Sequence, residues 1–194
     1  ADTIRVSGAP GADNSSYEFS GGTIRAQAVS VAHNGVGQFT QSGDANLETN
    51  ALIVGGASDS LFNRYRHDGG ETLVTGQFRV GNGVGSNAVY RLDQADPDHG
   101  TLLTTANAHV GSDGDGRFDH FGGRHVVTGR LVIGKHSGSS GRYSVSGGEL
   151  EADTIYVSEQ GDGAMAHWGG TVDVANLNVG GGEFGGSYDL YGTG

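Results

Sequence analysis

The chain repeats one pattern eight times, at intervals of about 22 to 30 residues. Each copy holds a short apolar-x-apolar segment, a Gly-rich turn, an aromatic residue and usually a closing Gly-Gly pair. A repeat of this length limits the fold to a solenoid, a propeller or another repeat array. The copies form one domain, residues 1–194, and they end near residues 22, 44, 70, 100, 123, 148, 170 and 194.

The apolar-x-apolar segment has apolar outer members in every copy. This alternation has period 2, which places the outer members on one face of a β-strand and leaves the middle residue for solvent. The segments are Ile4-Arg5-Val6, Val29-Ser30-Val31, Leu52-Ile53-Val54, Phe78-Arg79-Val80, Ala108-His109-Val110, Leu131-Val132-Ile133, Ile155-Tyr156-Val157 and Leu177-Asn178-Val179.

A second strand follows, and its aromatic position lies 10 to 13 residues after the first residue of the apolar-x-apolar segment. One of its positions is aromatic in seven of the eight copies: Tyr17, Phe39, Tyr65, Tyr90, Phe118, Tyr143, Met165 and Tyr188. Two residues on, and therefore on the same face, lie Phe19, Gln41, His67, Leu92, His120, Val145, His167 and Leu190.

These features predict an all-β fold, a single parallel β-helix (β-solenoid) of about eight coils with three short strands per coil. A propeller blade needs about 40 residues, and helical repeats need about 33 or more with sustained helical periodicity, which no window shows. The third strand is weaker, as in Thr23–Ala26. The 38 glycines suit corners that need positive φ or close backbone approach, and Asp44, in place of a closing glycine, is expected to tolerate the same conformation.

The acidic composition restricts the partners. With 11 basic and 22 acidic residues the formal net charge is −11, and no basic cluster is present, which argues against nucleic acid or anionic lipid. No apolar run reaches the length of a membrane span. A start at Ala1-Asp2-Thr3 is what signal-peptidase cleavage would leave, so we expect an extracellular protein, secreted or at the cell surface.

The repeat resembles a known group. Residues 147–157 read Gly-Gly-Glu-Leu-Glu-Ala-Asp-Thr-Ile-Tyr-Val, followed by Gly161-Asp162-Gly163. This pattern is similar to the β-solenoid repeats of bacterial secreted and surface proteins, among them autotransporter passenger-like proteins and those found with PEP-CTERM sorting signals. The resemblance implies an exported parallel β-helix and supplies no catalytic residues.

The two ends of the chain predict assembly. Laying Gly194 before Ala1 nearly restores one repeat, and open solenoid ends pair with other chains. We therefore expect head-to-tail stacking of copies into a homopolymer. The alternative is that the boundaries of the chain fall there by chance. The expected interface residues are Ile4, Val6, Tyr17, Phe19, Leu177, Val179, Tyr188 and Leu190.

Two groups of residues are candidates for metal binding. Asp113 and Asp115 in a Gly-rich turn, echoed by Asp162, offer oxygen ligands for a structural calcium ion, and no other cofactor is expected. The alternative is a set of solvated Asp-Gly turns. His67, His120 and His167 share one column, but they lie two coils apart, about 9.6 Å, which is too far for one zinc ion. Histidines bonded to backbone or water are therefore expected, and the other histidines, His125 among them, are expected at turns or outer positions.

The predicted function is a structural subunit of an extracellular filament or sheath, and no enzymatic activity is expected. One alternative is a carbohydrate-binding rod for surface polysaccharide, in which Tyr156, Phe121 and Trp168 would stack on sugar rings. Another is a polysaccharide-active β-helix enzyme, which would require paired carboxylates.

Overall fold

The computed structural model describes residues 1–6, 15–56, 63–94, 100–181 and 185–192. All regular structure in these ranges is β-strand. The strands are β1 (Thr3–Val6), β2 (Ser15–Val31), β3 (Gly37–Val54), β4 (Asn63–His67), β5 (Gly70–Val80), β6 (Asn87–Leu92), β7 (Thr101–Val110), β8 (Asp115–His120), β9 (Arg124–Ile133), β10 (Ser140–Val145), β11 (Glu149–Val157), β12 (Asp162–His167), β13 (Thr171–Val179) and β14 (Gly186–Leu190).

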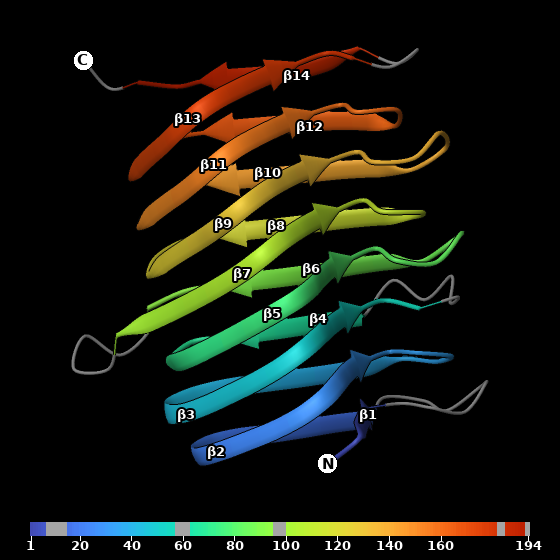
Figure 1. Cartoon of the computed structure of the whole chain (residues 1–194), viewed down its shortest axis with the longest axis vertical. Helices are drawn as coiled ribbons and strands as arrows, with labels where there is room; N and C mark the ends of the chain where they lie inside the picture. The colour runs from blue at the N-terminus through green and yellow to red at the C-terminus, as the bar shows by residue number, and fades with distance from the viewer. Residues whose placement is uncertain (7–14, 57–62, 95–99, 182–184, 193–194) are drawn as a thin grey trace.

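The strands stack in two facing layers that join at the N-terminal end of the molecule (Figure 1). One layer runs β13-β11-β9-β7-β5-β3, and from β3 the order continues through β4-β6-β8-β10-β12-β14. Each pairing between described strands is parallel, for example β10 with β8 and with β12. The chain is therefore an all-β parallel β-solenoid of about seven turns, which confirms the predicted fold class.

The number and division of strands differ from the prediction. In β5, β7, β9, β11 and β13 the weak strand and the apolar-x-apolar strand form one long strand, and in β5 the register shifts between Val74 and Gln77. β2 and β3 also include the aromatic strand. The β-bulge lets the backbone bend without ending the ladder. Eight coils of three separate strands are therefore not confirmed. The column of apolar-x-apolar segments has eight rungs, whereas the column that starts at Ile24 has seven.

Both predicted columns are aligned rung by rung. Tyr90 pairs with Phe118 and Phe118 with Tyr143, and their rings stack with centroids 5.0 and 4.4 Å apart. Leu92 pairs with His120 in the neighbouring column. In the interior coils the members of both columns are buried, except His167, which is half-buried, so the core is a set of stacked ladders that run the length of the solenoid.

The corners require glycine for two reasons: the backbone has positive φ, and there is no space for a Cβ atom. Gly148 has φ of 77°, and a Cβ there would lie 2.3 Å from the Gly123 carbonyl oxygen of the coil before it. The expectation for Asp44 is wrong, because the positive φ at that corner belongs to Gly43, at 58°. Asp44 pairs instead with Gly21.

Candidate functional site

The C-terminal end of the stack exposes side chains of the core type. β13 and β14 each pair with a strand on one side only within the described structure, which leaves their outer edges open. Leu177 and Val179 on β13, and Leu190 on β14, are exposed, and Tyr188 is half-buried. Their registers continue the interior columns, for example His167 with Leu190. This end presents apolar ladders in position for another rung.

The N-terminal end is less open. Tyr17 is 40% exposed and Ile4 is half-buried, but Val6 and Phe19 are already buried. A partner at this end would therefore gain contact mainly through Tyr17, Ile4 and the unpaired outer edge of β1, which pairs only with β2 among the described strands.

Inside the stack, each tyrosine of the aromatic column lies above a polar residue of the preceding coil. Tyr90 OH donates to His67 Nδ1 at 3.0 Å, and Tyr65 OH donates to Gln41 Oε1 at 2.6 Å. The remaining pairs of this kind are Tyr143 with His120 and Tyr188 with His167. Where the preceding coil carries an apolar residue, the next coil has no hydroxyl: Phe39 follows Phe19, Phe118 follows Leu92, and Met165 follows Val145.

The column histidines have a fixed tautomer. His67 Nε2 lies 3.1 Å from the Gly70 carbonyl oxygen, and because a carbonyl only accepts, Nε2 carries the proton. Nδ1 is then free to accept from Tyr90. His120 and His167 repeat this arrangement with Gly123 and Gly170. These contacts agree with the prediction that the column histidines are bonded to backbone.

His125 extends the network, and its predicted outer position is wrong because it is fully buried. Since Tyr143 OH donates to His120, its oxygen accepts from His125 Nδ1 at 2.9 Å. His125 Nε2 then accepts from Thr105 Oγ1 at 3.2 Å. The chain of donors satisfies each of these buried groups while all of them are neutral.

Burial keeps these imidazoles uncharged. Desolvation lowers the pKa of His67 and of His120 to about 4, although backbone carbonyls oppose the shift. Burial also lowers the pKa of His125 and raises that of Tyr90 and Tyr143. The hydrogen-bond network therefore stabilises the fold near neutral pH. In acid, protonation of these buried histidines destabilises the folded chain.

The predicted calcium ligands are not brought together. Asp115 and Asp162 start β8 and β12, two rungs apart, with Ser140 between them. Asp113 lies on the turn before β8, where its carboxylate accepts from His136 Nδ1 at 2.7 Å. No group of three or more His, Cys, Asp or Glu residues with metal-binding geometry occurs in the described ranges.

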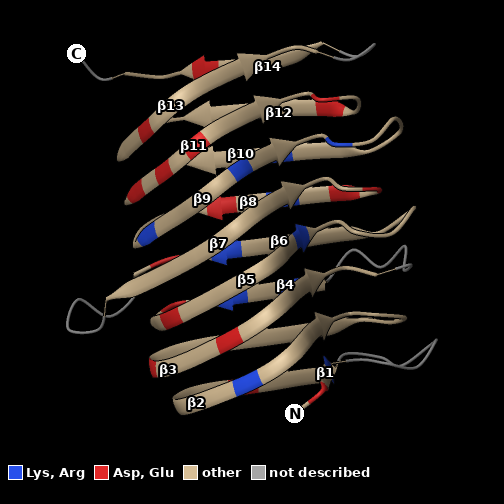
Figure 2. Cartoon of the chain, viewed as in Figure 1, with Lys and Arg blue, Asp and Glu red and all other residues tan. Residues whose placement is uncertain are grey.

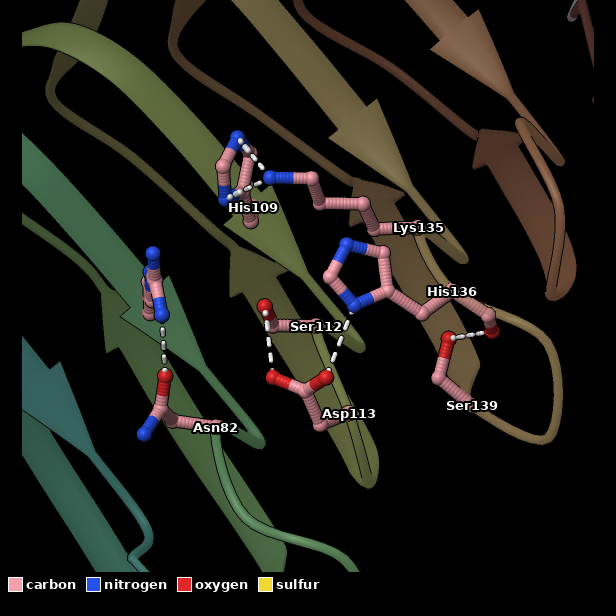
Figure 3. Close-up of polar contacts among 8 residues, drawn as sticks. Asn82, His109, Ser112, Asp113, Lys135, His136 and Ser139 are labelled. Carbon is pink, nitrogen blue, oxygen red and sulfur yellow. Dashed lines mark hydrogen bonds and ion pairs between the residues drawn. The ribbon is translucent and has the colours of Figure 1, made fainter.

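Figure 3 shows a polar cluster at the turns after β7 and β9. Ser112 Oγ donates to Asp113 at 3.3 Å, and Ser139 Oγ donates to the His136 carbonyl oxygen at 2.7 Å. Burial alone would raise the pKa of Asp113, but His136 lowers it overall. Because neither serine hydroxyl contacts the His136 imidazole, this arrangement is not a Ser-His-Asp relay.

In the same cluster Lys135 Nζ lies 3.3 and 3.4 Å from the two ring nitrogens of His109 (Figure 3). Burial, together with the nearby positive charge of Lys135, lowers the pKa of His109 to about 4. His109 is therefore neutral near pH 7. His109 pairs with Val132 on the neighbouring rung. Val132 is buried, although its middle position in the apolar-x-apolar segment predicts exposure.

The aromatic residues proposed for sugar stacking divide into two groups. Tyr156 has the Arg130 guanidinium 4.3 Å from its ring centroid, so one face of its ring is covered. Phe121 and Trp168 are exposed, and Trp168 stacks on Tyr191, a residue that the sequence interpretation missed. The signal was available, because Trp168 and Tyr191 both directly follow the column residue of their coil.

Charged residues of both signs are interspersed along the strands (Figure 2). On the outer face of β4, β6 and β8 the pairs lie two residues apart: Arg66 with Asp68, Arg91 with Asp93 and Arg117 with Asp119. These pairs neutralise charge locally, and they do not form a basic surface of the kind that nucleic acids need.

Comparisons with protein-family models, with curated proteins and with solved structures give no match for the chain. The resemblance to autotransporter passenger-like and PEP-CTERM-associated repeats stays a prediction. No helix long and apolar enough to cross a membrane is found in the described ranges.

Proposed function

We propose that the protein is a structural subunit of an extracellular filament or sheath, in which copies stack head to tail through their end rungs. The observation that carries this proposal is the exposure of Leu177, Val179 and Leu190 in columns whose interior members are buried, apart from the half-buried His167. In solenoids most of the stability of a coil comes from contact with its neighbours. A second copy would supply the outer neighbour that β13 and β14 do not have among the described strands.

The contact would be a continuation of the parallel ladder. β13 and β14 of one copy would pair with the open edges of β1 and β2 of the next, which is strand addition. A contact between two different surfaces propagates into a filament when rotation does not close it. In this arrangement each subunit contributes eight rungs of the aromatic column, and each coil is a set of three strand segments joined by corners.

The junction would differ from an interior rung in one respect. Tyr17 of one copy would lie above Leu190 of the copy beneath, whereas interior tyrosines lie above His or Gln. A buried hydroxyl without a partner costs about 1–3 kcal/mol. The junction is thus weaker than an interior rung, and filaments would exchange subunits there.

The test is a substitution on the exposed end. Leu190→Asp places a charge where the next copy must pack, and we expect the concentration needed for assembly to rise at least tenfold. Assembly is measured by sedimentation and by electron microscopy of the purified full chain.

Val84→Asp is the matched control, because Val84 is 85% exposed on the turn after β5 and gains the same charge. It should assemble as the unmodified chain does. If Leu190→Asp assembles normally, or if both variants fail equally, the C-terminal rung is not the interface.

A carbohydrate-binding role is the second candidate, favoured by the exposed pair of Trp168 and Tyr191. It is compatible with a filament, because these residues lie at a corner of the coil rather than in the core columns.

A further inference from the structure

The corner after β8, β10, β12 and β14 carries an exposed column of rings with one gap. At each corner a backbone amide donates a hydrogen bond to a carbonyl oxygen of the coil before it. The four corners therefore lie on consecutive rungs of the stack. The residues on these rungs are Phe121, Ser146, Trp168 and Tyr191. We propose that the space between Phe121 and Trp168, above Ser146, binds a pyranose ring of a neutral polysaccharide; we call it the aromatic slot.

The walls of the aromatic slot are two ring faces. Tyr191 covers one face of Trp168, with centroids 3.6 Å apart and planes 4° apart, so the open face of Trp168 looks toward the rung of Ser146. On the far side of the slot, the Arg91 guanidinium lies 4.8 Å from the Phe121 centroid and comes from the preceding rung. The open face of Phe121 therefore looks toward Ser146 as well.

The spacing suits one inserted ring. Phe121 and Trp168 are two rungs apart, about 9.6 Å at the usual distance between strands. The contact between Trp168 and Tyr191 shows that stacked rings here lie 3.6 Å apart. A ring between the walls needs twice that separation, which the slot provides with room to spare.

The floor of the slot is polar. Arg142, Ser144 and Ser146 alternate along β10 and its corner, so they share the outer face. Neither serine hydroxyl has a hydrogen-bond partner in the described part of the chain, and Arg142 makes no ion pair there. A pyranose with equatorial substituents has C–H bonds on its faces and hydroxyls around its edge. It therefore matches apolar walls and a polar floor together.

The ligand class follows from charge as well as shape. The formal net charge of −11 disfavours a polyanion such as a nucleic acid or a polyuronate. The slot is built within one chain, so it does not require the proposed filament.

Trp168 is the only tryptophan in the chain, so tryptophan fluorescence reports on the wall of the aromatic slot that Trp168 forms. We would titrate the full chain with cellohexaose, chitohexaose and mannohexaose, following Trp168 emission and the heat of binding. At least one of these glycans should give a saturable change in both measurements. Ser146→Phe, which fills the slot, should abolish it, and Phe121→Ala should weaken it at least tenfold.

Val84→Ala is the control, since it removes an exposed apolar side chain from a turn after β5. It should bind as the unmodified chain does, and circular dichroism checks that each variant is folded. The proposal is overturned if none of the three glycans binds, if Ser146→Phe binds unchanged, or if only hexagalacturonate or an aromatic peptide binds. Repeating the titration with Leu190→Asp separates this result from filament formation.

Discussion

Leu92 and Leu190 are both leucines of the same column, yet Leu92 is fully buried and Leu190 is 64% exposed. Leu92 lies between His67 and His120 on neighbouring rungs, whereas Leu190 has a described neighbour, His167, on one side only. The side chain and its own strand do not decide burial here. The adjacent coil does, and for that reason an end rung is a surface and an interior rung is core.

The comparison predicts a large difference between two identical substitutions. Leu92→Ala should lower the free energy of unfolding by about 2–5 kcal/mol, because it leaves a cavity in the stack. Leu190→Ala should cost under about 1 kcal/mol, because the side chain is already exposed. Urea unfolding of dilute protein, below the concentration of assembly, measures both. Similar losses would mean that the C-terminal rung is covered in solution.

Acid should destabilise the interior coils, which contain buried histidines, more than the end coils. The pKa of His67 is about 4 in the folded chain and about 6.5 when exposed. Between these values the unfolded chain binds more protons, so the free energy of unfolding falls as pH drops from 6.5 to 4, by about 3 kcal/mol for this histidine. Urea unfolding at pH 7.5 and pH 4.5 measures the loss.

His67→Gln is the matched variant, because Gln41 already fills this role one coil earlier: its amide donates to a backbone carbonyl and its Oε1 accepts from Tyr65. The variant should keep the hydrogen bonds and lose less stability in acid than the unmodified chain. An unchanged dependence on pH would show that His67 is not the group responsible.

The pairing of hydroxyl and acceptor can be tested by a double-mutant cycle. His67→Leu leaves Tyr90 OH buried without its acceptor, and adding Tyr90→Phe should recover about 1–3 kcal/mol. The resulting Leu-Phe pair already occurs in the chain as Leu92 and Phe118. If Tyr90→Phe has the same effect with His67 and with Leu at that position, the two residues are not coupled.

The smallest effect concerns the junction. If Tyr17 packs above Leu190 of another copy, Tyr17→Phe removes an unsatisfied hydroxyl and should strengthen assembly by about 1 kcal/mol, or roughly fivefold in critical concentration. Sedimentation measures the change. Weaker assembly would instead show that the coil beneath Tyr17 offers a polar acceptor.

The repeat pattern was sufficient to predict the parallel solenoid and the register of both columns, because period 2 and the spacing of the copies leave few other arrangements. It could not show that two strands merge through a bulge in β5, since that depends on the backbone path. The pairing of tyrosines with His or Gln was visible in the sequence but required comparison of successive copies. His125 was misplaced because a polar residue in the seven-rung column looks like a surface residue until Thr105 and Tyr143 are seen beside it.

Cryo-electron microscopy of the purified full chain at high concentration tests the central claim most directly. The account predicts a continuous β-solenoid rod in which subunits repeat axially at about 38 Å, eight rungs of about 4.8 Å each, with the rung of Leu190 against that of Tyr17. Isolated subunits, or copies joined through the sides of the solenoid with free end rungs, would contradict it.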